Sequence, residues 1–174
     1  GLDTCEVALT DASRVVGSVC QDVDSQFVTS VVEDEMLYGL ENFGVPRDEI
    51  EGRLEQALDD MGIADLRDRT ITSLSGGQKQ KVAIASILAL NPRVLVLDEP
   101  TAELDPASSV AVFELLARYA RENGTTVIVV EQKIALLSDY ADLLVIVDGG
   151  SIRYAGTPDE VLAHSDELLA LGVN

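Results

Sequence analysis

The chain has 174 residues, of which 47% are hydrophobic, and 31 Asp and Glu residues against 12 Lys and Arg give it a formal net charge of −19. This length and apolar fraction suffice for one sizeable core, so we expect one domain with at most a small appended lobe. The acidic balance argues against a nucleic-acid partner, because affinity for a phosphate backbone comes from clustered Lys and Arg. No run approaches the ~18 apolar residues of a membrane span, and the first residues lack the pattern of a signal peptide, so we expect a soluble, intracellular protein.

Lysine is scarce in this acidic chain, which has only Lys79, Lys81 and Lys133. An acidic, lysine-poor surface resembles that of proteins from salt-loving organisms, where concentrated salt screens the repulsion between carboxylates. An ordinary acidic protein is the alternative. The two cysteines, Cys5 and Cys20, lack the paired spacing of metal ligands, so we expect buried, reduced thiols.

In chain order, the first readable element is a β-branched strand over 14–20, which leads directly into Gln21. Two helices are expected next, over 31–44 and 46–61. In the second helix apolar residues recur near the 3.6-residue period, and Pro46 suits the first helical position. These two helices indicate a small helical lobe.

A glycine-bearing helix start follows at Leu74 to Gln78. Ser75 is a good N-cap residue, and Gln78 three positions later completes a capping-box pattern. Gly76 and Gly77 allow an anion to approach the free backbone N–H groups at the positive end of the helix. The stretch therefore favours a phosphate site, although an ordinary capped helix has the same pattern.

A continuous apolar run over 94–97 then ends in Asp98 and Glu99. Such a run is typical of a strand buried on both faces of a parallel sheet, and ligands bind at the C-terminal ends of these strands. The carboxylate pair suits a metal. Beyond it, Asp105 and Pro106 predict the start of another helix.

The last third of the chain predicts one more parallel strand and a hairpin. The strand covers 125–131, and the strand-helix-strand order makes it a parallel neighbour of the preceding strand. After a short helix, strands at 143–147 and 151–156 flank an Asp-Gly-Gly turn, which favours a hairpin. A terminal helix is expected from residue 157, and His164, the only histidine, is expected at the surface.

Three of these pieces occur in an order that is specific to one family. Leu74 to Gln78, the strand over 94–99 and Leu104-Asp105-Pro106 resemble the LSGGQ signature, the Walker B strand and the D-loop of the ATP-binding cassette (ABC) ATPases. The resemblance implies an α/β fold of the P-loop NTPase type, with a parallel sheet and a small helical subdomain. It divides the domain 1–174 into a helical part with the signature helix over about 22–91, a Walker B half with the hairpin over 92–156, and a C-terminal helix over 157–174.

The sequence departs from this family in two ways. No Gly-x-x-x-x-Gly-Lys-Ser/Thr loop, the element that cradles the phosphates, occurs in the 174 residues. Since the family carries that loop upstream of the position matched by Gly1, we expect a domain that is incomplete at its N-terminus. The second departure is Gln132, which stands where the family usually has a His; an amide can donate a hydrogen bond but cannot carry a proton.

The resemblance also implies roles for individual residues, with ATP and Mg²⁺ as cofactors. Asp98 would orient the magnesium through water, Glu99 would polarise the attacking water, and Gln21 would complete the metal and water shell. Gln132 would act as the phosphate-sensing residue. The nucleotide contacts would come from Gln21, Leu74, Ser75, Gly76, Gly77, Gln78 and Asp105. Of these, Ser75 and Gly77 would bind the γ-phosphate held by the opposite subunit.

The stretches Asp24 to Val28 and Val32 to Glu35 resemble the ATPases of energy-coupling-factor importers, which handle vitamins and metal ions such as cobalt or nickel. The resemblance therefore implies an ATP-hydrolysing subunit at the cytoplasmic face of the membrane, with a second ABC ATPase subunit and a transmembrane subunit as partners. One alternative is a non-enzymatic subunit that contributes only a signature half-site, or no activity. Another is an ABC ATPase of DNA repair or chromosome maintenance, which the acidic charge and the short interval between Gln21 and Leu74 disfavour.

Overall fold

The computed structural model describes residues 8–170 and residue 172. The chain divides into two compact units, Gly1–Val130 and Glu131–Asn174, which are described separately below. The first unit contains α1 (Leu9–Ser13), β1 (Val16–Val19), η1 (Val23–Ser25), α2 (Val32–Asn42), α3 (Arg47–Asp60), η2 (Ala64–Leu66), η3 (Ile71–Ser73), α4 (Gly76–Leu88), β2 (Val94–Asp98), α5 (Pro106–Asn123) and β3 (Thr126–Val130). The second contains α6 (Ile134–Ser138), β4 (Leu144–Asp148), β5 (Ser151–Gly156), α7 (Pro158–Leu162) and α8 (Ser165–Ala170).

The first unit is built on a parallel sheet in the order β1-β2-β3. The register places Val19 of β1 beside Leu97 of β2, and Asp98 beside Val130 of β3. The expected parallel pairing of the strands before and after α5 is thus confirmed. Because all three strands run the same way, the residues that follow them gather at one edge of the sheet.

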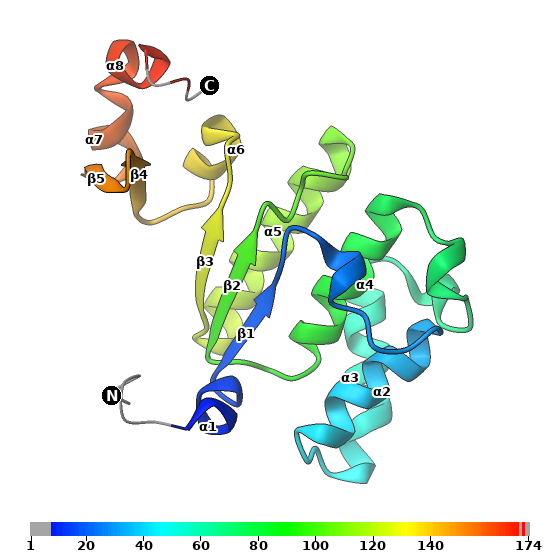
Figure 1. The fold of residues 1–174 in the computed structure, drawn as a ribbon. Coiled ribbons are helices and arrows are strands. Elements are labelled where there is room, and N and C mark those ends of the chain that lie inside the picture. Colours follow the sequence, from blue (N-terminus) through cyan, green and yellow to red (C-terminus); the bar gives the residue numbers. More distant parts are fainter. Residues whose placement is uncertain (1–7, 171, 173–174) are drawn as a thin grey trace. The chain divides into compact units, whose positions relative to one another are not determined.

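One face of this sheet is covered by α4 and α5 (Figure 1). Leu95 and Leu97 of β2 point into that layer and are 0% exposed. Gly17 of β1 allows the close approach of α4, because a Cβ at this position would lie 2.4 Å from Cγ2 of Ile87. The absence of a side chain at Gly17 therefore sets the distance between strand and helix.

The opposite face of the sheet is much more open. Ile128 and Val130 of β3 are 49% and 56% exposed, and Val94 and Val96 of β2 are only partly buried. The prediction that the 94–97 strand is buried on both faces is therefore wrong for the described residues. Alternation along β2 shows the reason, since every second side chain faces the uncovered side.

Three helices, α2, α3 and α4, pack together to form the expected helical lobe. Their contact is made by side chains that are 0 to 2% exposed: Met36, Leu40, Leu54, Leu58 and Ile84. Pro46 is the N-cap of α3 rather than its first helical residue, because its ψ of 137° is extended. The lobe is continuous with the sheet core through α4.

The second unit is an antiparallel hairpin with short helices. β4 pairs with β5 around Gly149 and Gly150, whose φ values of 55° and 76° suit a tight hairpin turn, so the expected hairpin is confirmed. The expected terminal helix is divided into α7 and α8. The ring of His164 stacks on that of Tyr154 at 4.3 Å, and the His side chain is 46% exposed. Within the part of the chain that the structure describes, no helix is long and apolar enough to cross a membrane.

Candidate functional site

Gln21 and Glu99 meet at the edge of the sheet where β1 and β2 end. Nε2 of Gln21 donates a hydrogen bond to Oε2 of Glu99 over 2.9 Å. The two residues lie 78 positions apart in sequence, but each follows one of two neighbouring parallel strands. The structure therefore joins two of the residues that the sequence assigned to metal and water.

The backbone of Glu99 has an uncommon conformation, with a φ of +46°. Non-glycine residues rarely adopt positive φ, and such strain is concentrated at functional sites. The conformation is supported by a hydrogen bond of 2.8 Å from the Glu99 N–H to the carbonyl of Val130, and the Glu99 carbonyl accepts one of 3.1 Å from Ala102. Asp98, the last residue of β2, is exposed at the same edge. Both carboxylates thus stand at the carboxyl end of the central strand.

The start of α4 has the capping geometry that the sequence predicts. Ser75 is the N-cap; its Oγ accepts from the Gln78 N–H at 3.3 Å, and Oε1 of Gln78 accepts from the Ser75 N–H at 3.0 Å. Leu74, just before the cap, is 7% exposed and belongs to the core. The burial of its side chain therefore attaches the start of α4 to the hydrophobic core.

Gly76 and Gly77 lie against the turn that follows β2. A Cβ on Gly76 would lie 2.7 Å from Oε2 of Glu103, and one on Gly77 would lie 3.0 Å from the Glu103 carbonyl oxygen and 3.2 Å from Cδ2 of Leu104. The two glycines therefore also have a packing role inside this chain. No local sequence pattern indicates this contact, because Glu103 is 26 to 27 positions away from the glycines.

Asp105 caps α5 and lies in the turn matched to the D-loop. Its Oδ1 accepts hydrogen bonds of 3.0 Å from the backbone N–H groups of Ala107 and Ser108. Hydrogen bonds from the side chain and backbone of Ser108, followed by that from Ala107, hold the pKa of the Asp105 carboxyl below its usual value. The residue is therefore a carboxylate at neutral pH, with a structural role that is independent of any nucleotide.

Residues 20–29, which follow β1 and are called here the Gln21 segment, are held in place by contacts that the sequence did not predict. Cys20 is exposed, contrary to the expectation of a buried thiol, because it follows the end of β1; Cys5 lies outside the described residues. The Cys20 N–H donates to Oε1 of Gln26 at 3.0 Å. Nζ of Lys79 on α4 lies 2.7 Å from Oδ1 of Asp24. No local pattern reveals these bonds, since they depend on tertiary packing.

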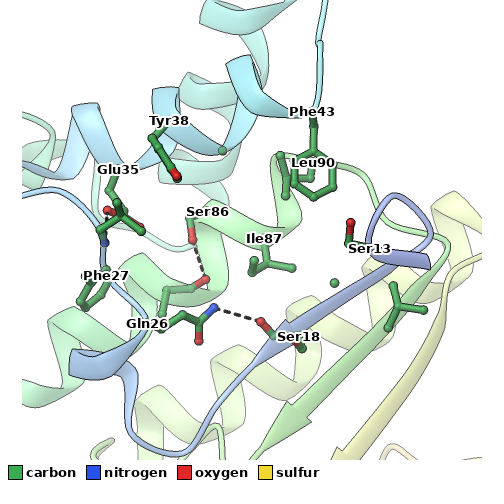
Figure 2. A pocket seen from close by; sticks show the side chains of 15 residues that line it. Ser13, Ser18, Gln26, Phe27, Glu35, Tyr38, Phe43, Ser86, Ile87 and Leu90 are labelled. Carbon is green, nitrogen blue, oxygen red and sulfur yellow. Dashed lines mark hydrogen bonds between the residues drawn. The ribbon is translucent and has the colours of Figure 1, made fainter. Parts of the chain in front are cut away.

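A cavity of about 260 Å³ lies beside this segment, between β1, α2 and α4. Figure 2 shows Gln26 and Ser18 at one side of it, Glu35 and Tyr38 on α2, Ile87 on α4, and Leu90 just after α4. Gln132 belongs to the second unit and precedes α6 in sequence. Its backbone N–H donates to Oε1 of Glu131 at 3.0 Å.

A family model described as ABC transporter matches residues 3–102 of the chain. The chain belongs to this family. Similar proteins include the energy-coupling factor transporter ATP-binding protein EcfA1 of Lacticaseibacillus paracasei, which is 40% identical over 174 residues; the match covers 100% of this chain and 62% of that protein. A putative ABC transporter ATP-binding protein of Streptomyces avermitilis is 46% identical over 166 residues, covering 95% of this chain and 30% of that protein.

The ABC fold is also shared with a solved structure, cbiO1 from Clostridium perfringens, described as part of the ABC transporter complex cbiONQ. The two chains are 34% identical with a TM-score of 0.80, and the match covers 95% of this chain and 66% of the other. The α/β architecture with a parallel sheet is thus confirmed as that of an ABC ATPase. This chain spans between 30% and 66% of the length of these three proteins.

Proposed function

We propose that this chain is part of the ATP-hydrolysing subunit of a membrane importer of the energy-coupling-factor type. The observation that carries the proposal is the 2.9 Å hydrogen bond between Gln21 and Glu99 at the carboxyl edge of the sheet. It joins the Q-loop glutamine to the Walker B glutamate, where phosphoryl transfer to water needs a positioned base and a metal ligand. Vitamins or transition-metal ions are the proposed cargo.

The residues at this edge suit Mg²⁺ and a nucleotide, although no cluster of three His, Cys, Asp or Glu side chains forms a metal cage in the described ranges. Magnesium keeps several waters and is bound through one or two carboxylates together with substrate phosphates, so Asp98 and the amide oxygen of Gln21 would be the contribution of this chain, beside the hydroxyl of a phosphate-binding loop. When bound, the ion neutralises charge that develops on the transferred phosphoryl group. Asp98 would hold the ion through water, and Glu99 would accept a hydrogen bond from the attacking water.

The signature helix would act on a nucleotide held by a second ABC subunit. Ser75 and Gly77 would present a hydroxyl and a backbone N–H to its γ-phosphate, at the positive end of α4. Asp105, at the adjacent helix start, would lie in the same interface. A non-enzymatic subunit that offers only this half-site is the alternative, and the fusion experiment below distinguishes the two.

The transmembrane subunit would contact the cavity shown in Figure 2. Its rim includes Tyr38, which is 47% exposed, and Val28, which is 63% exposed. Such exposed apolar groups beside a cavity suit a helix of a partner protein. Tyr38→Glu should weaken copurification with the membrane subunit at the cytoplasmic face, whereas Val110→Glu on α5, also an exposed apolar position at 40%, should leave it unchanged.

A fusion tests the enzyme assignment directly. A phosphate-binding loop of the Gly-x-x-x-x-Gly-Lys-Ser/Thr type, with the strand before it and the helix after it, would be joined to the start of this chain. The fused protein should hydrolyse ATP, and Glu99→Gln should abolish turnover. Glu114→Gln, the same change at an exposed position of α5, is the matched control. Nucleotide binding without turnover in the fused protein would instead favour the half-site donor.

A further inference from the structure

The side chain of Gln26 spans two backbone groups at the end of β1. Its Oε1 accepts from the N–H of Cys20 at 3.0 Å, and its Nε2 donates to the carbonyl of Ser18 at 3.0 Å (Figure 2 shows the latter bond). A neighbouring strand in a parallel sheet bonds in the same way, to the N–H and C=O of residues two apart. The Gln26 amide therefore pairs with the outer edge of β1 and carries that pairing one residue beyond the strand, to Cys20, which leads to Gln21.

This extension ends next to the catalytic pair. Cys20 directly precedes Gln21, whose Nε2 lies 2.9 Å from Oε2 of Glu99. Glu99 is itself fixed through its backbone bond of 2.8 Å to Val130. The position of Gln21 relative to Glu99 thus depends on where the chain leaves β1, which is the point that Gln26 holds.

Two other contacts hold the same segment, but at a greater distance from Gln21. Asp24 is paired with Lys79 of α4 at 2.7 Å. Glu35 of α2, only 8% exposed, accepts hydrogen bonds through Oε2 from the N–H groups of Val28 at 3.0 Å and Thr29 at 2.7 Å, and from the Thr29 hydroxyl at 3.0 Å. These contacts tie the segment to helices. Of these three contacts, only the Gln26 bonds reach the backbone that leads from β1 into Gln21; the Ser25 hydroxyl bonds to the Asp22 carbonyl, on the other side of Gln21, at 2.8 Å.

The geometry points to Gln26 as a positioning residue for the Gln21–Glu99 pair. Gln26 also lines the cavity beside α2 and α4, so a polar group that enters the cavity can compete for the amide that holds Gln21. The catalytic consequence of this placement rests on the proposed function. The placement itself does not, because it concerns side chains of this chain alone.

NMR spectroscopy of the 174-residue chain separates a positioning role from local stabilisation. The first readout is hydrogen exchange of the Cys20 N–H, and the second is the resonance of the Gln21 side-chain amide. Gln26→Ala should speed exchange at Cys20 by about five- to tenfold, the value of one hydrogen bond. It should also move the Gln21 side-chain resonances toward those of a solvated glutamine. Faster exchange with unchanged Gln21 resonances would overturn the proposal.

Two further variants keep the experiment decisive. Ser25→Ala removes a bond of 2.8 Å to the Asp22 carbonyl in the same segment, so it should leave both readouts unchanged; a shift at Gln21 equal to that of Gln26→Ala would contradict the assignment. Gln26→Glu keeps the acceptor for Cys20 but loses the donor to Ser18, and should move the Gln21 resonances less than Gln26→Ala does. Should Gln26→Ala fail to fold, unmoved Gln21 resonances in Gln26→Glu would reject the proposal. No nucleotide is present, so the result is independent of ATPase activity.

Discussion

Nζ of Lys79 lies 2.7 Å from Oδ1 and 3.0 Å from Oδ2 of Asp24, and this ion pair joins the signature helix α4 to the helical turn after Gln21. The Lys79 side chain is only 18% exposed, but that of Asp24 is 64% exposed, so water and salt reach the carboxylate of the pair. The two segments are 55 positions apart in sequence. Packing of the signature helix α4 against η1 therefore fixes the Gln21 segment relative to that helix.

The chain as it stands should neither bind nor hydrolyse ATP appreciably. The phosphate-binding loop, which supplies much of the contact to the phosphates, does not occur in the 174 residues. Isothermal titration with Mg·ATP and a steady-state phosphate-release assay measure the two properties. Micromolar affinity together with turnover that Glu99→Gln abolishes would contradict this expectation.

Thermal stability should rise with salt concentration. The chain carries 31 acidic and 12 basic residues, so ion pairs such as that of Arg67 with Glu51 at 2.6 Å can neutralise only a minority of the carboxylates. Salt weakens such pairs, but it weakens the more numerous repulsions as well, and at ~1 M the Debye length is about 3 Å. Calorimetry in dilute and molar KCl should show a higher Tm in the latter. An unchanged Tm would favour the ordinary acidic protein.

The two signature glycines should differ in their effect on stability. At Gly77 an added methyl group meets the backbone carbonyl of Glu103 at 3.0 Å, so Gly77→Ala should lower the free energy of unfolding by about 1 to 3 kcal/mol. At Gly76 it meets the flexible end of the Glu103 side chain, so Gly76→Ala should stay within about 0.5 kcal/mol of the wild type. Urea unfolding measures both variants. Gly76→Ala combined with Glu103→Ala is the control, and equal losses at the two glycines would refute the packing role.

The sequence predicted features that depend on neighbours along the chain. The Ser75 cap is one of these features, since its bonds form with residues three positions away. The proximity of Gln21 and Glu99 could also be predicted, because the parallel pairing of β1 and β2 brings the residues that follow the two strands to one edge of the sheet. The Gln26 bonds were not predicted, because a loop glutamine can satisfy its amide in many ways and only the folded chain shows which.

Exposure was the property that the sequence predicted least well. Cys20 is exposed although a free cysteine is usually buried, because it lies just beyond the last residue of β1. Ile128 and Val130 of β3 are likewise open to solvent in a strand whose composition is that of a buried one. The apolar composition of a strand indicates that its side chains can be buried, whereas their actual exposure depends on which elements pack against the strand.

The capping role of Asp105 should appear in the pH dependence of stability. Hydrogen bonds from Ser108 and Ala107 lower the pKa of Asp105 in the folded state, so this contribution is complete above the usual Asp pKa of about 3.9 and is lost as the pH falls through the lower folded-state value. Asp105→Ala should therefore be less stable than the wild type at pH 7, and the difference should shrink at pH 3. Asp105→Ser keeps a cap that does not titrate and should be closer to the wild type at both pH values. A difference that is constant with pH would exclude the carboxylate as the source.

Gln132 should limit catalysis in a form of the protein that carries a phosphate-binding loop. If it occupies the position of the phosphate-sensing residue, Gln132→His should raise the ATP turnover number and leave nucleotide affinity nearly unchanged, because the group acts on charge that develops in the transition state. Charge-assisted hydrogen bonds are about twice as strong as neutral ones, so an increase of about tenfold, or ~1.4 kcal/mol, is expected.

The alternative role for Gln132 was to cap the helix that follows it. In the structure α6 begins at Ile134, its N-cap position is Lys133, and the side chain of Lys133 makes no capping hydrogen bond. The backbone N–H groups of Gln132 and Lys133 both donate to Oε1 of Glu131, at 3.0 and 3.4 Å, so the turn is supported without a cap from Gln132. Gln132→Ala should therefore lower turnover in the loop-bearing form. Equal ATPase rates for the Gln, His and Ala proteins would remove Gln132 from the site.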